Sequence, residues 1–144
     1  MHSTKDNLEV LFEDNHLLIV NKKSGDIVQG DKTGDKPLSE VVKEYIKEKY
    51  NKPGEVFLGV VHRLDRPTSG IIIFARTSKA LERLNKMLRD RVISKTYWAI
   101  IKNNPKKVKG AFLLNQITNG NWEVTKYYGF NKEKKTIYYQ SRFF

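Results

Sequence analysis

Short runs of mostly hydrophobic residues, separated by short polar segments, follow one another along most of this chain. The alternation, with turn-forming residues between the runs, predicts strands at residues 8–12, 16–21, 56–61, 71–74, 94–101, 111–117, 122–128 and 136–139. Apolar residues at helical spacing predict one helix that Pro37 opens and Pro53-Gly54 closes, and a second from Thr77 or Ser78 to about Asp90. We therefore expect an α+β domain with a mainly antiparallel, mixed sheet and two helices packed on it.

Local composition marks the ends and loops of this domain. The first seven residues are polar and unpatterned, so we expect a flexible N-terminus over residues 1–7 and one domain over residues 8–144. Glycine, serine and threonine interrupt residues 22–36, which predicts an irregular loop of the kind that borders binding sites. A chain of 144 residues can bury about 70% of the surface that it exposes when unfolded, so a hydrophobic core is possible.

The charge of the chain is strongly positive and unevenly distributed. The formal net charge is +11, and residues 101–144 carry nine Lys and Arg against two Asp and Glu, whereas residues 1–50 carry eight against ten. This balance favours a polyanionic partner, and nucleic acid is the class we expect. The polycationic loop at residues 102–110 is suited to phosphate contacts through Lys106, Lys107 and Lys109, with solubility as the alternative explanation.

Several functional classes find no support in the composition. The chain has no cysteine, and its histidines, His2, His16 and His62, are too scattered to suggest a metal site. No apolar run is longer than a strand, so we expect no membrane segment. We predict a soluble cytoplasmic protein that needs neither disulfides nor a metal.

One stretch, residues 59–74, concentrates the candidate chemistry. An apolar strand enters a loop in which Asp65 lies between Arg63 and Arg66, and a second apolar strand follows Gly70. Two neighbouring cations favour an ionised aspartate, and Pro67 gives the turn a fixed geometry. The pattern therefore predicts a positioned carboxylate. A surface ion pair between Asp65 and an arginine explains the same residues equally well.

The same stretch resembles the signature of the RluA-type RNA pseudouridine synthases. The signature reads His-Arg-Leu-Asp, two variable positions and Thr-Ser-Gly before an apolar strand, and residues 62–65 and 68–70 match it. Residues 12–22 look like the first motif of the family, and residues 95–101 look like its tyrosine-bearing strand. Several motifs in the right order over residues 9–128 make the likeness specific.

The resemblance implies isomerisation of uridine to pseudouridine in rRNA or tRNA without a cofactor. It makes Asp65 the catalytic carboxylate, with Tyr97 packed against the flipped uracil and Arg63 displacing the base from its stack. His62 and Arg66 complete the implied RNA-binding residues of the loop. An ionised Asp65 can attack the ribose, attack the base or stabilise a developing oxocarbenium ion, and the sequence leaves these mechanisms open.

One family motif is missing. Members carry a later motif, Arg-x-His-Gln-Ile-Arg, whose last basic residue pairs with the catalytic aspartate, but no histidine follows His62 and Arg142 is the one arginine after Arg91. We therefore expect a C-terminally truncated catalytic domain. The alternative to an active synthase is a catalytically weak or inactive fragment that still binds RNA.

A glycoside hydrolase is a third hypothesis, since it also places carboxylates beside a sugar carbon. Glycosidases mostly use two carboxylates, and the nearest acid downstream of Asp65 is Glu82, on the charged side of the second predicted helix. The sequence does not favour this class.

Overall fold

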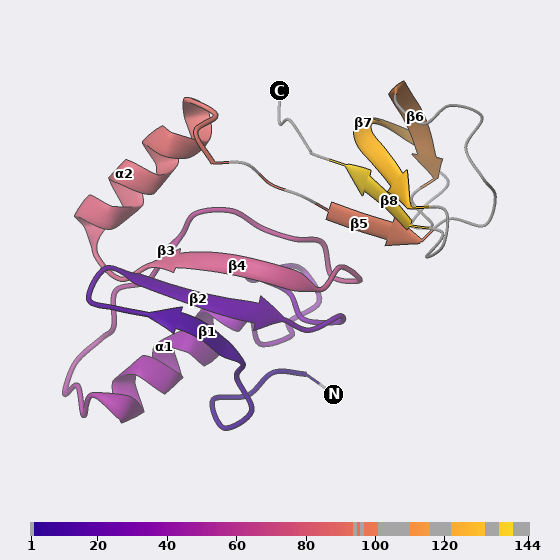
Figure 1. Ribbon diagram of the computed structural model, residues 1–144. Coiled ribbons are helices and arrows are strands. Elements are labelled where there is room, and N and C mark those ends of the chain that lie inside the picture. The colour runs from indigo at the N-terminus through magenta and orange to yellow at the C-terminus, as the bar shows by residue number, and fades with distance from the viewer. Residues whose placement is uncertain are drawn as a thin grey trace. The chain divides into compact units, whose positions relative to one another are not determined.

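The structure is a computed structural model with two compact units (Figure 1). It describes residues 2–93, 95, 97–100, 110–115, 122–131 and 136–139, and the side chains of residues 2–93 and 95. The first unit is Met1–Asp90 and the second is Arg91–Phe144.

The first unit is built on a four-stranded antiparallel sheet. Its strands are β1 (Val10–Glu13), β2 (Leu17–Lys22), β3 (Gly59–Val60) and β4 (Gly70–Ala75), in the order β1-β2-β4-β3. β2 and β4 pair along their whole length, with Leu17 opposite Ala75 and Lys22 opposite Gly70. The β2 end at Lys22 therefore lies beside the start of β4, where the loop that carries Asp65 rejoins the sheet.

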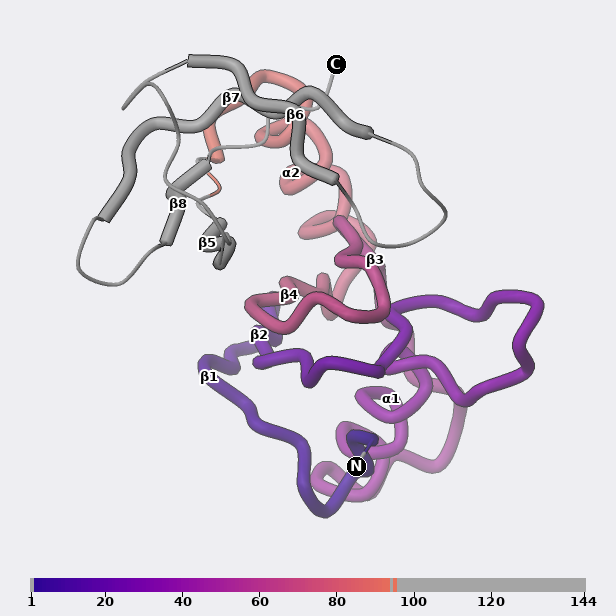
Figure 2. Tube along the Cα trace, turned by 90° about the vertical axis from the view of Figure 1, so that its right-hand side faces the viewer, coloured from indigo at the N-terminus to yellow at the C-terminus, as the bar shows by residue number. Residues whose placement is uncertain are grey.

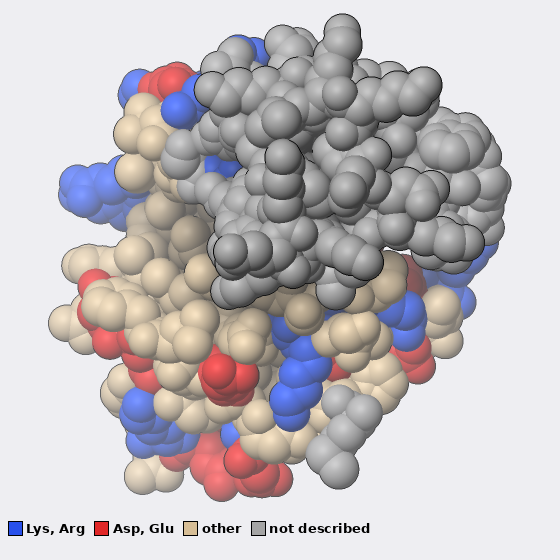
Figure 3. All heavy atoms as spheres, turned by 45° about the vertical axis from the view of Figure 1, so that its right-hand side comes forward, with Lys and Arg blue, Asp and Glu red and all other residues tan. Residues whose placement is uncertain are grey.

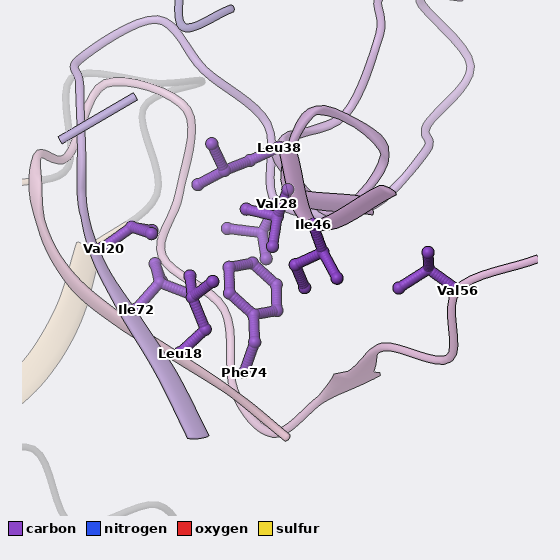
Figure 4. Close-up of a cluster of buried hydrophobic side chains, with 9 residues drawn as sticks. Leu18, Val20, Val28, Leu38, Ile46, Val56, Ile72 and Phe74 are labelled. Atoms are coloured by element: carbon purple, nitrogen blue, oxygen red, sulfur yellow. The ribbon is translucent and has the colours of Figure 1, made fainter. Parts of the chain in front are cut away.

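Helix α1 (Leu38–Lys49) covers one face of this sheet. Its apolar positions pack against inward-facing residues of β2 and β4, and Figure 4 shows the ring of Phe74 between the helix and strand residues. The buried cluster comprises Leu18, Val20, Val28, Leu38, Val42, Ile46, Val56, Ile72 and Phe74. This cluster is the hydrophobic core that holds the first unit together.

Helix α2 (Ser78–Arg89) packs against β3 and β4 on the opposite face. Gly59 is the register partner of Ala75, which points away from the face that carries Phe74. A Cβ built on Gly59 would lie 2.9 Å from the Leu81 side chain of α2, so the missing side chain gives the helix its place on the strand. The Thr77 hydroxyl oxygen accepts a hydrogen bond from the N–H of Ala80 at 3.1 Å, so Thr77, one of the two caps that the sequence allows, caps the helix.

The second unit contains another antiparallel sheet. Its strands are β5 (Tyr97–Ile100), β6 (Gly110–Asn115), β7 (Trp122–Asn131) and β8 (Thr136–Tyr139), in the order β5-β8-β7-β6. Consecutive strands β6, β7 and β8 are neighbours, which confirms the predicted meander of strands in this part of the chain.

The α+β class and both helices are confirmed, with differences at the element ends. All strand pairs among the described residues are antiparallel. β3 is shorter than its predicted range of 56–61, and Val56 packs in the core outside the sheet. The expected flexibility of residues 1–7 stays a prediction, although Ser3 is buried and its N–H donates to the Asp26 carboxylate at 3.0 Å.

The described residues contain neither a membrane-spanning helix nor a metal-binding cluster. None of the helices found there has the length and apolar character that crossing a bilayer requires. In the same part of the chain, no three His, Cys, Asp or Glu side chains form a group that could hold a metal ion.

Candidate active site

The loop between β3 and β4, residues 61–69, carries the candidate catalytic residue. Asp65 opens a turn in which the N–H of Thr68 donates to the Asp65 carbonyl oxygen at 3.0 Å. Gly70 ends the loop with a φ of +140°, a conformation that side-chain-bearing residues rarely adopt. The Asp65 side chain is exposed to solvent on this turn.

Lys22, the last residue of β2, holds the β3–β4 loop through hydrogen bonds from its buried side chain. Its side chain has no solvent exposure, and its Nζ donates to the carbonyl oxygens of Lys23 at 3.1 Å, Arg66 at 3.1 Å and Thr68 at 2.6 Å. These three acceptors match the three donors of an ammonium group, which is what a buried charge requires. Lys22 therefore joins the end of β2 to the residues just after Asp65.

The two residues after Lys23 complete this anchor. The N–H of Gly25 donates to the Arg66 carbonyl oxygen at 2.8 Å, and the Ser24 hydroxyl donates to that of Pro67 at 2.9 Å. Three consecutive carbonyl oxygens after Asp65, at residues 66–68, thus accept hydrogen bonds from residues 22–25. This fixes the backbone that positions the carboxylate.

Electrostatics also links Lys22 to the candidate site. Burial lowers the pKa of the Lys22 ammonium, while the negative charges of Asp26 and then Asp65 oppose that shift. The attraction to Asp65 adds to the hydrogen bonds that hold the loop.

Sequence reasoning missed the role of Lys22, which it used only as part of a motif. A signal was present, because Lys22 continues the inward-facing phase of Leu18 and Val20 along β2. A lysine at such a position must either find hydrogen-bond acceptors inside the protein or leave the strand pattern.

The surface ion pair considered for Asp65 is not formed. The Arg66 guanidinium instead contacts the carboxylates of Asp35, at 2.6 Å, and Asp31, at 3.4 Å. Within residues 2–93, neither the exposed Arg63 guanidinium nor the Asp65 carboxylate makes a side-chain hydrogen bond or an ion pair. Both charged groups of the motif are therefore available to a ligand.

His62 bonds to the sheet. Its Nε2 accepts a hydrogen bond from the N–H of Ile73 in β4 at 3.1 Å. Ile73 comes directly before Phe74, where the pairing of β4 with β3 ends. An accepting Nε2 requires a neutral imidazole, so in this arrangement His62 supports the loop rather than offering a positive charge. Its predicted contact with RNA stays a prediction.

The other predicted site residues lie in the second unit. Tyr97 is the first residue of β5, where it is the register partner of Tyr139, and its side chain lies outside the described part. Lys106, Lys107 and Lys109 lie outside the described residues altogether. Their predicted roles stay predictions.

Solved structures share this fold. The chain matches the human RNA Pseudouridylate Synthase Domain Containing 4 with a TM-score of 0.69 at 21% identity, covering 92% of this chain and 57% of that one. It matches the human RNA Pseudouridylate Synthase Domain Containing 1 with a TM-score of 0.57 at 16% identity, covering 88% and 53%. At these identities the likeness shows the fold.

Curated sequences are more similar. Ribosomal large subunit pseudouridine synthase C of Pasteurella multocida is 38% identical over 116 residues, which are 78% of this chain and 34% of that protein. The Escherichia coli K12 protein of the same name is 36% identical over 115 residues, with coverage of 77% and 34%. The chain thus spans about a third of the length of these relatives. The model of the RNA pseudouridylate synthase family matches residues 16–143, and the chain belongs to that family.

Proposed function

We propose that this chain isomerises uridine to pseudouridine in structured RNA, with Asp65 as the catalytic carboxylate. One observation carries the proposal: Asp65 is exposed on a turn whose following carbonyl oxygens are fixed by Lys22, Ser24 and Gly25. Family membership supports the same reaction. Because the curated relatives are named for the large ribosomal subunit, we propose rRNA as the substrate, with tRNA as the alternative.

The proposed reaction needs a carboxylate but no cofactor. The N1–C1′ bond of uridine breaks, the uracil rotates, and C5 forms the new bond to C1′ while the C5 proton is lost and N1 gains a proton. An ionised Asp65 can attack C1′, attack the base or stabilise positive charge developing on the ribose. Exclusion of water during this step protects the intermediate from hydrolysis.

Access to the uridine is the second requirement. A base within folded RNA must leave its stack, at a cost of a few kcal/mol. The exposed Arg63, two residues before Asp65, is suited to replacing the base in the stack. Tyr97 is the aromatic residue that we propose packs against the flipped uracil.

Tritium release from RNA labelled at C5 of uridine tests this function. We expect release with the unmodified chain and at least a hundredfold slower release with Asp65→Ala or Asp65→Asn, because the reacting carboxylate is lost. Glu55→Gln is the control, since Glu55 is also an exposed acid and makes no side-chain interaction within residues 2–93.

RNA binding measured on the same variants separates catalysis from binding. Absence of tritium release from the unmodified chain would contradict the proposed enzyme. Salt-dependent RNA binding that survives Asp65→Ala in such an inactive chain would instead support the RNA-binding alternative.

A further inference from the structure

The segment between β2 and α1 contains an exposed loop whose two ends are joined by backbone hydrogen bonds. Residues 29–36, called the strap here, are all exposed, and Figure 2 shows the chain between β2 and α1 projecting beyond the sheet. The N–H of Leu38 donates to the Ile27 carbonyl oxygen at 2.7 Å, and that of Ser39 donates to Val28 at 3.2 Å. Because Ile27, Val28 and Leu38 are buried, the strap can move without disturbing the core.

Arg66 of the catalytic loop holds the strap. Its guanidinium donates to the Asp35 carboxylate at 2.6 Å, the Thr33 hydroxyl at 2.8 Å and the Asp31 carboxylate at 3.4 Å. Among the hydrogen bonds within residues 2–93, the other one that joins the strap to the rest of the chain runs from Lys36 to Glu44. The strap is thus fastened to the candidate site through one arginine.

The strap presents its oxygen atoms as a preformed acceptor for that arginine. The N–H and hydroxyl of Thr33 donate to the Asp31 carboxylate, and these hydrogen bonds, with the Arg66 charge, hold the pKa of Asp31 below its usual range. Three oxygen-bearing side chains thus surround one guanidinium, as the oxygens of a phosphate group would. The lowered pKa keeps the Asp31 carboxylate ionised at neutral pH.

The two ends of Arg66 differ in how firmly they are held. The carbonyl oxygen of Arg66 accepts hydrogen bonds from the Lys22 Nζ and the Gly25 N–H, which hold the backbone. The Arg66 side chain, by contrast, is 35% exposed. The Asp31 and Asp35 side chains are 41% and 52% exposed, so water and salt weaken both ion pairs. The guanidinium can therefore change partners while the catalytic loop keeps its backbone.

We propose that Asp31 and Asp35 compete with an RNA phosphate for Arg66, so that RNA binding releases the strap from the catalytic loop. The inference rests on the proposed function in taking RNA as the ligand. An approaching phosphate offers two oxygen atoms for the bidentate hydrogen bonding that guanidinium groups favour, so it can bind Arg66 in place of the two carboxylates.

Binding of a fluorescein-labelled uridine 20-mer, measured by anisotropy, tests the competition. We expect Asp31→Asn/Asp35→Asn to bind the 20-mer about fivefold more tightly than the unmodified chain, because the competing carboxylates are gone. In an Arg66→Gln background the same two substitutions should change the affinity less than twofold, since no guanidinium remains to compete for.

A matched control removes the general effect of charge. Glu55→Gln/Glu82→Gln also removes two exposed acids, and neither residue has an interaction within residues 2–93. An equal gain in affinity with this control, or a gain that persists with Arg66→Gln, would overturn the competition. Unchanged or weaker binding by Asp31→Asn/Asp35→Asn would overturn it too.

Hydrogen exchange reports on the strap itself. We expect the amides of residues 29–36 to exchange faster when the 20-mer is bound, and equally fast in Arg66→Gln without RNA. Slower exchange or no change on RNA binding contradicts release of the strap. If the unmodified chain and all variants fail to bind RNA, this inference and the RNA-binding basis of the proposed function both fail. If the chain releases tritium but hydrogen exchange at residues 29–36 does not change when RNA binds, only this inference fails.

Discussion

At the residue scale, the candidate site divides its tasks between a buried lysine and an exposed aspartate. Lys22 has no solvent exposure, and its ammonium group donates three hydrogen bonds to backbone carbonyl oxygens. Asp65 stays exposed, without a side-chain hydrogen bond within residues 2–93. The buried residue thus fixes the backbone, so that the exposed one can meet a ligand in a constant position.

Replacing Lys22 should therefore uncouple the loop from the sheet. We expect Lys22→Met to lower the rate of tritium release at least tenfold and to reduce the free energy of unfolding by about 1–3 kcal/mol, because three carbonyl oxygens lose a charged donor. Hydrogen exchange at residues 66–69 should become faster.

Lys23→Met is the matched control, because the Lys23 Nζ makes a single long contact, 3.4 Å, with the Asn7 carbonyl oxygen. Normal loop protection and a normal rate in Lys22→Met would show that the anchor does not position Asp65.

At the element scale, helix α2 depends on the absence of a side chain in β3. Leu81 of α2 would meet a Cβ on Gly59 with its Cδ atoms at 2.9 Å and its own Cβ at 3.1 Å. A rotamer change can move the Cδ atoms, but the Cβ moves only with the helix. Gly59 therefore sets the distance between α2 and the sheet.

We expect Gly59→Ala to lower the free energy of unfolding by roughly 1–3 kcal/mol, the usual effect of overpacking. Leu81→Ala in the same chain should recover part of this loss, because the overlapping Cδ atoms are removed. Urea unfolding measures both changes.

Gly54→Ala is the control, since nothing lies within 4 Å of a Cβ at that position. Independent, additive effects of Gly59→Ala and Leu81→Ala would mean that the two residues do not clash.

At the scale of the whole molecule, the formal net charge is +11, but the described surface in view in Figure 3 is not uniformly basic. Figure 3 shows acidic groups interspersed among the basic ones on the described surface in view. Glu13 shows how such an acid is used: its carboxylate accepts from Tyr45, Lys49 and Tyr50 of the α1 region and from Arg76, just after β4. This cluster ties three parts of the first unit together.

Acid should weaken this cluster. Burial raises the pKa of Glu13, but the hydrogen bonds from Lys49, Tyr50 and Tyr45 together outweigh it and leave the pKa below its usual value. As the pH falls, Glu13 therefore takes up its proton in the unfolded chain before it does so in the folded chain. The stabilisation from Glu13 is complete above about pH 5, and it is lost as the pH falls through the usual glutamate range to the lower pKa of the folded state.

We expect Glu13→Gln to be about 2–3 kcal/mol less stable than the unmodified chain at pH 7, because its side chain is only 9% exposed and its cationic partners would lose their counter-charge. Urea unfolding at pH 7, 5, 4 and 3 should show that difference narrowing with acid. A difference that stays constant from pH 7 to 3 would exclude this role for Glu13, and Glu55→Gln serves as the neutral reference.

The sequence by itself determined the elements and the identity of the loop. Short apolar runs bounded by turn residues located β2 and β4, helical spacing located both helices, and Thr77 or Ser78 marked the start of α2. The motif around Asp65 was recognisable because its residues are contiguous. Such features depend on neighbours within a few positions, where side-chain periodicity and turn chemistry act.

Only the tertiary structure decided which charges meet. Lys22 reaches carbonyl oxygens 44 and 46 residues later, and the Arg66 guanidinium reaches Asp35, 31 residues earlier. The sequence placed Arg66 beside Asp65, but the Arg66 guanidinium pairs with Asp31 and Asp35, while the Asp65 carboxylate makes no hydrogen bond or ion pair within residues 2–93. Chain closure through the β2–β4 pairing brings these groups together, and burial then selects which charge must be satisfied inside the protein and which stays free for a ligand.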